Sequence, residues 1–352
     1  MISSSSSKKP YDDDESTITS TTISTTTTTN GGSSGCGNTT ENELDAKPFI
    51  SEAIGDSHQL QQFETQFVTN VYNEIAPHFS NTRYSRWPFI NEFILGKKNC
   101  LFADVGCGNG KYMQSWKETI QFYNGTSLSK TSTSNCFIGT DISLGLAEIC
   151  RDRDLEVLVA NNTQLPFRGE YFDVVISVAV IHHFATRERR MQAIRELFRI
   201  CKKGGEVLIY VWAFEQAPKK KSVTGEDGTT STPSYRYAQQ DVFVPWHLQK
   251  QFDSKKTKSS KETPESAPSS IQETSSSSNM NILPNVTEGS EGEKVYKRYY
   301  HLFKRGELEQ LVQDASVMMD DSSGEQRTLF EFEFVKNYYF EKDNWGVVCR
   351  KK

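Results

Sequence analysis

The stretch NCLFADVGCGNGKYM, residues 99–113, decides the fold. Its first half is apolar enough to form a buried strand, and the segment that starts at Gly110 has the composition of a helix. Between them Gly106, Gly108 and Gly110 form a glycine turn, where the backbone can bend sharply and approach a ligand closely. The dinucleotide fingerprint G-x-G-x-x-G would need a third glycine where the chain has Lys111. The spacing therefore disfavours a dehydrogenase.

An acidic residue, Asp104, precedes the glycine turn at the end of the predicted strand. A carboxylate at this position would repel a pyrophosphate, whereas it would attract a ligand that carries an ammonium and a sulfonium. We therefore expect S-adenosylmethionine as the cofactor, with the glycine turn under its amino-acid end. The competing interpretation is a tight strand-to-helix turn that binds no ligand.

Strand-like and helix-like segments alternate along the chain after this turn. Strands are expected at 135–143, 155–161, 171–184 and 205–214, and residues 332–352 are expected to form two strands around an Asp343-Asn344 turn. Helices lie between them, and the one over 186–205 is expected to stop at Gly204 and Gly205. This order predicts an α/β, Rossmann-like fold: a mostly parallel seven-stranded sheet with an antiparallel C-terminal strand and helices on both faces.

Upstream of the glycine turn, apolar residues four apart within 60–79 predict a helix, and a second helix is expected to begin near Trp87 and Pro88. Two other segments have compositions that do not support a core: residues 1–55 are rich in Ser and Thr, and residues 215–292 in Ser, Thr, Lys and Glu. We therefore expect one folded domain, 56–352, with a disordered tail at 1–55 and a low-complexity lysine- and serine-rich insert at 215–292.

The composition limits the classes of function. The sequence has no apolar run of about 18 residues and no secretory signal, so we expect no membrane span. The seven cysteines form no C-x-x-C or C-x-x-H pair, which indicates reduced thiols, no metal site and a cytoplasmic location, with the nucleus as an alternative. The formal net charge of −5 does not suggest a general nucleic-acid binder, so such binding must come from local basic patches.

The order of these features resembles that of class I S-adenosylmethionine-dependent methyltransferases over about residues 60–350. Besides the glycine turn, the resemblance includes an acidic residue after the second strand, LPF at 165–167, FDVVIS at 172–177 and GGEVLIYVW at 204–212. Four further segments are similar to those of the fungal tRNA wobble-uridine methyltransferases and of the methyltransferase domain of the animal AlkB-type tRNA hydroxylase-methyltransferase. They are VYNEIAPHFSNTRYSRWPFI (71–90), VAVIHHFATRERR (178–190), QDVFVPWHL (240–248) and YYHLFKRGELE (299–309).

This resemblance implies methyl transfer to the carboxylate of 5-carboxymethyluridine at the wobble position of the tRNA anticodon, which forms 5-methoxycarbonylmethyluridine. It also implies two partners, the tRNA anticodon stem-loop and a small zinc-binding activator subunit that docks on the sheet. A carboxylic acid ionises near pH 4, at roughly the value of a side-chain carboxyl, so the acceptor needs no general base. The alternatives are a small-molecule O- or C-methyltransferase, which would not depend on tRNA, and a catalytically silent scaffold, which would not bind the cofactor.

The resemblance assigns cofactor contacts to residues that follow the strands. Asp141 is expected to accept the ribose hydroxyls, although an Asp that caps the next helix is equally compatible with this position. Asn161 replaces the Asp that usually accepts a hydrogen bond from the adenine amino group; its carbonyl can still accept and its amide can donate. The expected cofactor-binding residues are Asp104, Gly106, Gly108, Gly110, Asp141, Ile142, Asn161 and Val178.

Acceptor contacts are expected from two of the family segments. Arg83 is expected to hold the uridine's carboxylate, and Tyr84 and Trp87 to stack on or enclose the extruded base. His182, placed at the end of the fourth strand, is expected to donate to the acceptor oxygen or the uracil, with a structural role as the alternative. For His183 the choice between a site role and a backbone contact stays open.

Basic residues beyond this cluster have two interpretations. Arg187 and Arg189 are candidates for contacts with tRNA phosphates, and a solvated helix face is the alternative. Lysines at 219–221 and 250–261 either bind tRNA as a flexible arm or belong to a linker. Another basic cluster, before the last helix, comprises Lys294, Lys297, Arg298, Lys304 and Arg305.

Overall fold

The computed structural model describes residues 57–124, 135–216, 236–253, 285–290, 292–319 and 324–352. The predicted tail and the lysines at 219–221 and 255–261 lie outside these described residues. Within the described part, no helix is long and apolar enough to cross a membrane. Nor do three or more His, Cys, Asp or Glu side chains of the described residues gather in a group that could hold a metal ion.

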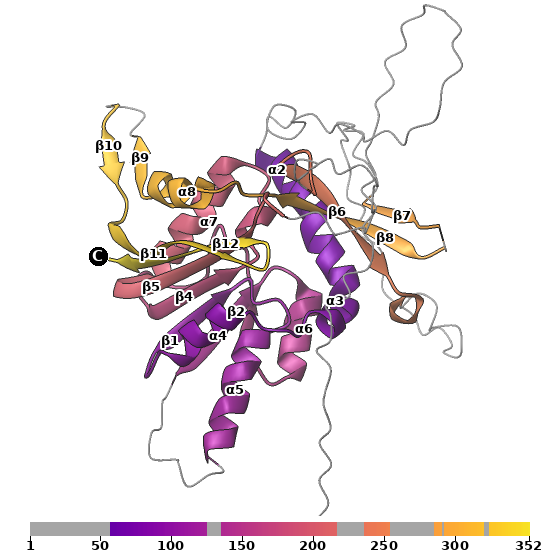
Figure 1. The fold of residues 1–352 in the computed structure, drawn as a ribbon, viewed down its shortest axis with the longest axis horizontal. Coiled ribbons are helices and arrows are strands. Elements are labelled where there is room, and N and C mark those ends of the chain that lie inside the picture. The colour runs from indigo at the N-terminus through magenta and orange to yellow at the C-terminus, as the bar shows by residue number, and fades with distance from the viewer. Residues whose placement is uncertain (1–56, 125–134, 217–235, 254–284, 291, 320–323) are drawn as a thin grey trace, which may run out of the picture.

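A seven-stranded sheet forms the centre of the fold, in the order β11-β12-β5-β4-β1-β2-β3 (Figure 1). Strands β1 to β5 pair in parallel, whereas β12 is antiparallel to both β5 and β11. This arrangement confirms the predicted sheet. The strands are β1 Leu101–Val105, β2 Cys136–Asp141, β3 Val157–Val159, β4 Phe172–Val178, β5 Cys201–Trp212, β11 Phe332–Glu341 and β12 Asn344–Lys351.

Helices cover both faces of this sheet because its central strands are apolar on both faces. In β5, Val207, Ile209 and Val211 join one core cluster, and the alternate residues Leu208 and Tyr210 join another. Helices α7 (Arg187–Ile200) and α8 (Glu307–Ala315) pack on the first cluster, and α4 (Pro88–Leu95) and α5 (Lys111–Asn124) pack on the second. Helix α6 (Leu144–Asp152) follows β2. The predicted helices on both faces are therefore confirmed.

A three-stranded antiparallel sheet, which we call the accessory sheet, lies beside the N-terminal helices (Figure 1). It consists of β6 (Asp241–Leu248), β8 (Lys294–His301) and β7 (Val286–Glu288). The helices are α2 (Ser57–Glu64), a π-helical turn (Thr65–Thr69) and α3 (Asn70–Thr82). Segment 236–253 falls inside the predicted insert, yet it forms β6 and a short 3-10 helix, Lys250–Phe252. A small hairpin of β9 (Val317–Met319) and β10 (Gln326–Thr328) follows α8.

Three predicted boundaries are wrong. Helix α7 ends at Ile200 and not at Gly204, because Cys201 already pairs with Phe172 of β4. Strand β4 ends at Val178, so His182 lies in a 3-10 turn, Ile181–His183, and not on the strand.

The third boundary concerns the C-terminal hairpin. Its turn is Lys342-Asp343, with φ of 47° and 59°, so Asn344 already belongs to β12. The turn therefore lies one residue earlier than predicted.

Gly346 on β12 faces Tyr210 on β5, and a Cβ at this position would lie 2.5 Å from the ring. Tyr210 is fully buried, so its ring cannot move into solvent. We expect Gly346→Ala to lower the free energy of unfolding by about 1–3 kcal/mol, the usual cost of overpacking. Denaturant unfolding monitored by circular dichroism would measure the change.

The control is the double variant Gly346→Ala with Tyr210→Leu. If the loss comes from the contact with the ring, the double variant should lose less free energy than the sum of the two single variants. Strictly additive losses would contradict this explanation.

Candidate active site

The glycine turn connects β1 to α5 at the carboxyl end of the parallel strands. Gly106, Gly108 and Gly110 have φ of 77°, 57° and 71°, a region that side chains disfavour. A Cβ on Gly106 would lie 2.3 Å from the side chain of Val180, and one on Gly110 would lie 2.5 Å from Leu155. Conformation therefore favours glycine at all three positions, and lack of space requires it at Gly106 and Gly110.

Asp104 lies in β1 just before this turn, and it is 1% exposed. Burial raises its pKa to about 7, with the nearby Asp141 acting in the same direction and Lys111 opposing. Its Oδ2 has no hydrogen-bond partner among the described residues. A buried carboxylate without a donor is costly, so a cationic ligand at this position would relieve the cost. This observation fits the ammonium of S-adenosylmethionine.

Asp141, the last residue of β2, holds the glycine turn in place. Its Oδ2 accepts from the Gly108 amide at 2.8 Å, and its Oδ1 accepts from the Ser143 amide at 2.9 Å. Burial raises the pKa of Asp141 and these backbone bonds oppose the rise. The side-chain cap of α6 is Ser143 and not Asp141. Each carboxylate oxygen still has a lone pair for a ribose hydroxyl.

The other predicted cofactor residues lie around the ends of β2, β3 and β4. Ile142 is 39% exposed beside Asp141, and Val178 ends β4. The side-chain carbonyl oxygen of Asn161 already accepts from the backbone amide and the hydroxyl of Thr163, both at 2.9 Å. Its side-chain NH2 group is left as the donor to a ligand. Asn162 is buried, and its Oδ1 has no partner among the described residues. No sequence pattern distinguishes Asn162 from Asn161.

The connector between α3 and α4, residues 83–87, carries three predicted acceptor residues and is tied to the glycine turn. Asn109 in the turn donates from Nδ2 to the Arg83 carbonyl at 3.2 Å. Lys111 donates to the Ser85 carbonyl at 3.1 Å, and its Nζ lies 5.2 Å from the centre of the Trp87 ring. Sequence reasoning missed both Asn109 and Lys111, although they stand within the motif itself. Arg83 and Trp87 are therefore held beside the glycine turn.

Tyr84 and Trp87 differ in exposure. Tyr84 is 67% exposed, so its ring is accessible for stacking. Trp87 is only partly exposed and lies 5.7 Å from the fully buried Tyr210 ring.

His182 presents a hydrogen-bond donor inside the protein. Its Nδ1 accepts from the Trp212 amide at 3.2 Å, so in the neutral ring the proton is on Nε2. Burial, followed by the nearby His183 and Arg298, holds its pKa well below the usual value. Nε2 is buried and has no partner among the described residues. His182 is therefore a neutral residue with an N–H available to a ligand.

His183 is used within the fold. Its Nδ1 lies 2.9 Å from the Tyr299 carbonyl, which can only accept, so Nδ1 carries the proton. Its Nε2 lies 3.1 Å from the Tyr72 hydroxyl. Burial lowers its pKa to about 3. Of the two interpretations of His183, the geometry supports the backbone contact.

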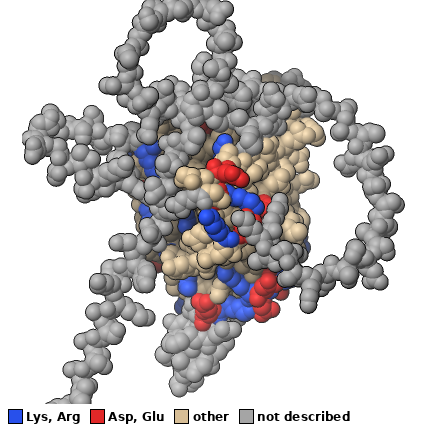
Figure 2. Space-filling model, turned by 90° about the vertical axis from the view of Figure 1, so that its right-hand side faces the viewer, with Lys and Arg blue, Asp and Glu red and all other residues tan. Residues whose placement is uncertain are grey.

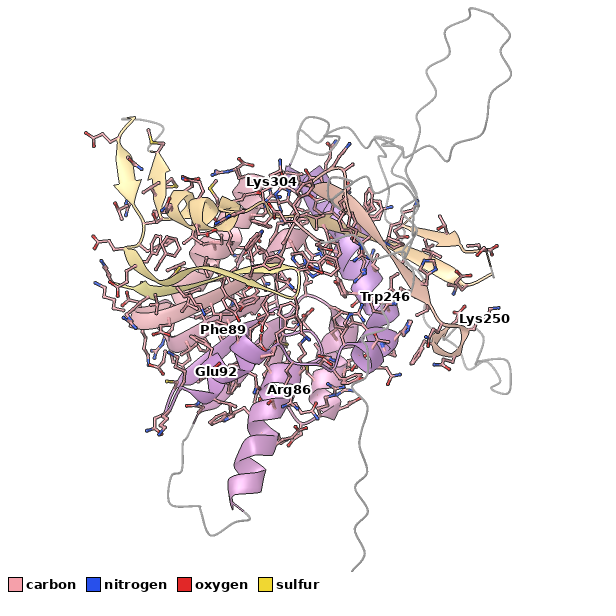
Figure 3. All side chains as sticks on the ribbon, in the orientation of Figure 1. Arg86, Phe89, Glu92, Trp246, Lys250 and Lys304 are labelled. Carbon is pink, nitrogen blue, oxygen red and sulfur yellow. The ribbon has the colours of Figure 1, made fainter. Side chains whose placement is uncertain are left out.

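Two arginines meet at one aromatic side chain of the accessory sheet. Trp246 projects from β6 beside α3 (Figure 3), where it packs with Val71 and Ile75. The guanidinium carbon of Arg83 lies 5.2 Å from the Trp246 ring centre, and that of Arg298 lies 4.6 Å from it. Arg298 was grouped with a basic cluster near the last helix, but it is only 4% exposed. It belongs to the site region.

The other predicted phosphate contacts already have carboxylate partners. Arg187 forms an ion pair with Asp314 of α8, and Arg189 forms one with Glu64 of α2 at 2.6 Å. Neither is brought to the cluster around Trp246. Figure 2 views the face with α3 and the accessory sheet: basic and acidic side chains stand together in its middle.

Comparisons with known proteins identify the family. A family model described as "Methyltransferase domain" matches residues 103–209. The chain is 36% identical over 311 residues to "tRNA (carboxymethyluridine(34)-5-O)-methyltransferase alkbh8" of Xenopus tropicalis, covering 82% of this chain and 41% of that protein. It is 33% identical over 327 residues to "tRNA (carboxymethyluridine(34)-5-O)-methyltransferase" of Saccharomyces cerevisiae, covering 84% of this chain and 99% of that protein. The chain thus spans less than half of the frog protein and nearly all of the yeast protein.

Solved structures align more weakly. An S-adenosylmethionine-dependent methyltransferase from Clostridium acetobutylicum aligns with a TM-score of 0.42 at 10% identity, over 80% of this chain and 99% of that chain. A complex between the Haloferax volcanii Trm112 methyltransferase activator and a methyltransferase aligns with a TM-score of 0.27 at 18% identity, over 43% of this chain and 59% of that chain. These scores add nothing to the family match.

The raised pKa of Asp104 makes cofactor affinity depend on pH. Below about pH 7 the free protein holds a proton on this carboxyl, and a cationic ligand must displace it. We expect the affinity for S-adenosylmethionine to rise with pH, by up to about tenfold per unit, and to level off above about pH 7. Isothermal titration calorimetry between about pH 5.5 and 7.5 would measure it, and buffers of different ionisation enthalpy would count the released proton.

Asp104→Asn is the matched control, because it keeps the shape and removes the titration. This variant should bind S-adenosylmethionine more weakly than the wild type. Its affinity should not change with pH in the same range, apart from any change caused by ionisation of the ligand itself. A wild-type affinity that is flat between about pH 5.5 and 7 would contradict the assignment of Asp104.

Proposed function

Because the chain belongs to the tRNA (carboxymethyluridine(34)-5-O)-methyltransferase family, we propose that it methylates the carboxylate of 5-carboxymethyluridine at position 34 of tRNA, using S-adenosylmethionine. The product is the methyl ester, 5-methoxycarbonylmethyluridine. One observation carries the proposal: the buried Asp104 carboxylate and the Arg83 guanidinium both interact electrostatically with Lys111, so a negative and a positive group lie near the same residue of the glycine turn. The first suits a cationic methyl donor and the second an anionic acceptor.

S-adenosylmethionine, when bound, supplies the methyl group. Asp104 accepts from its ammonium, and Gly106, Gly108 and Gly110 allow the backbone to lie against its amino-acid end. Asp141 accepts from the ribose hydroxyls. The proposed contacts around the base are Ile142, Asn161 and Val178.

On the acceptor side, Arg83 holds the carboxylate, and Tyr84 and Trp87 stack on or enclose the base. His182 donates from Nε2 and does not act as a base, because its ring is neutral and its Nδ1 already accepts a backbone bond. No base is needed, since the acceptor is ionised at neutral pH. The residues serve to select the anion, orient it and exclude water, and a dry site favours the union of an anion with a cation.

Other predicted residues receive different roles. His183 is structural, since both its nitrogens are bonded within the fold. Arg187 and Arg189 are assigned no acceptor contact in this proposal, because each forms an ion pair that joins α7 to another helix. The anticodon stem-loop is the proposed substrate, and the cytoplasm remains the predicted location.

An activator subunit is the proposed protein partner. The solved Trm112 complex concerns another methyltransferase, but the present chain has a surface suited to such a subunit. Strand β3 is the last strand of the sheet, so one of its edges is unpaired within the described residues. Two of its three residues, Leu158 and Val159, are 44% and 55% exposed, and Leu144 nearby in α6 is 55% exposed. An exposed apolar edge of this kind indicates a binding surface.

Arg83→Ala tests the proposed reaction. The wild-type chain with its activator should convert 5-carboxymethyluridine in tRNA to the ester, and the variant should lose at least about tenfold in turnover, because a charge-assisted contact to the anion is removed. Affinity for S-adenosylmethionine should stay within about twofold. Nucleoside mass spectrometry of digested tRNA measures the ester.

Arg151→Ala is the control, since Arg151 is exposed and pairs only with its neighbour Asp152. It should keep wild-type turnover. A wild-type chain that leaves carboxymethyluridine unesterified, or that methylates a small molecule without tRNA, would refute the proposed function.

Val159→Asp tests the activator surface. A charge on this edge strand should prevent docking while leaving the cofactor turn intact, because Val159 contributes an exposed side chain. We expect the variant to lose co-purification with the activator when the two are expressed together. Val335→Asp, at a 47% exposed position on β11 at the opposite edge of the sheet, should keep it.

A further inference from the structure

Arg298 on β8 is a buried charge without a counter-ion. It is 4% exposed, and it forms no ion pair with any residue that the structure describes. Its Nε has no hydrogen-bond partner among those residues either. A guanidinium cannot lose its proton in a protein, so burying it without a counter-ion is unfavourable. The other buried arginine, Arg190, differs, because it lies close enough to Asp241 to lower the pKa of that carboxyl.

A chain of hydrogen bonds fixes the orientation of this guanidinium. His183 must donate from Nδ1 to the Tyr299 carbonyl, so its Nε2 accepts from the Tyr72 hydroxyl. The Tyr72 oxygen is then left to accept from the Tyr300 hydroxyl at 3.1 Å. The Tyr300 oxygen in turn accepts from Nη1 of Arg298 at 2.9 Å. Every proton in the chain thus has one direction, and the Tyr300 and Tyr72 oxygens orient Arg298 without supplying a negative charge.

The surroundings of Arg298 supply further donors and no described carboxylate. Arg83 shares the Trp246 ring with it, and the Tyr300 ring stacks on His182 at 4.7 Å. The Nε2–H of His182 has no partner in the described chain. Like charges that converge on one ring repel each other unless an anion lies near them. The cluster therefore offers two guanidiniums and one neutral N–H donor to an anion.

We propose that Arg298, together with Arg83 and the Nε2–H of His182, binds the carboxylate of the carboxymethyl group and selects the acid form of the wobble uridine. This inference rests on the proposed function and adds its specificity determinant. An unmodified uridine or a neutral amide would leave the buried guanidinium without its counter-ion, which makes discrimination strong. A tRNA phosphate is the other anion that the same chemistry would accept.

The test compares anticodon stem-loops with 5-carboxymethyluridine, its neutral amide or plain uridine at position 34. Binding is measured to the complex of the chain with its activator, loaded with S-adenosylhomocysteine so that no turnover occurs. The wild type should prefer the acid by at least about tenfold, the equivalent of one charge-assisted bond. Arg298→Gln should reduce this preference to about twofold or less, with affinities for plain uridine and for S-adenosylhomocysteine within about twofold of wild type.

Lys297→Gln is the matched control, since it removes a charge from the neighbouring residue, whose side chain points to the other face of β8. It should keep the wild-type preference. Should Arg298→Gln fail to fold, Arg298→Lys keeps the charge but loses the planar fork. It should bind the acid at least about threefold less tightly than wild type and plain uridine unchanged.

Three outcomes would overturn the inference. One is a folded Arg298→Gln variant that keeps the full preference for the acid. Another is an equal loss of affinity for all three stem-loops, which would assign Arg298 to a phosphate. The third is Arg298→Lys binding all three as the wild type does. If one of these outcomes is found and the wild type still esterifies carboxymethyluridine, the proposed function stands and only the role of Arg298 is refuted. If the wild type shows no turnover, the proposed function itself is refuted.

Discussion

The hydrogen bond from the Gly108 amide to the Asp141 carboxylate is the interaction on which both halves of the site depend. It fixes the glycine turn against the end of β2, with Gly106 and Cys107 donating to the Thr140 carbonyl at 2.7 and 2.8 Å. Once the turn is fixed, Asn109 holds the Arg83 connector against it. The same backbone path therefore sets the position of the cofactor side and of the acceptor side, so neither can shift alone.

The second feature of the site is a separation of buried charge. Asp104 lacks a donor, and Arg298 lacks a carboxylate, within the part of the chain that the structure describes. The two charges would gain energy by pairing, yet they belong to different sheets. Because the fold holds Asp104 and Arg298 apart, each can pair with a ligand of opposite charge. Methyl transfer removes the negative charge of the acceptor, so a site with Arg298 favours the acid over its ester, whereas the ammonium opposite Asp104 is the same before and after transfer.

The sequence predicted the parts of the molecule that depend on local patterns. The glycine turn, the strand order and the antiparallel hairpin follow from spacing and from apolar runs. The end of α7 did not, because pairing of Cys201 with β4 overrides the helix-breaking effect of Gly204. Arg298 was grouped with a basic cluster before the last helix, and its burial depends on the pairing of β8 with β6, a contact between segments about 50 residues apart across low-complexity sequence. Arg187 is similar: its ion pair with Asp314 exists only in the folded packing of α7 on α8.

The glycine turn does not indicate which acceptor is bound, because some of the proposed acceptor contacts come from the accessory sheet. The central sheet supplies Asp104, Asp141 and the glycines, which suit a cofactor that many enzymes share. Trp246 and Arg298 come from β6 and β8, which pair with each other outside the central sheet. A change in these two strands would alter which acceptor is bound while leaving the cofactor turn untouched. In the proposed site, the residues that select the substrate and those that bind the methyl donor thus belong to different sheets, joined at the Arg83 connector.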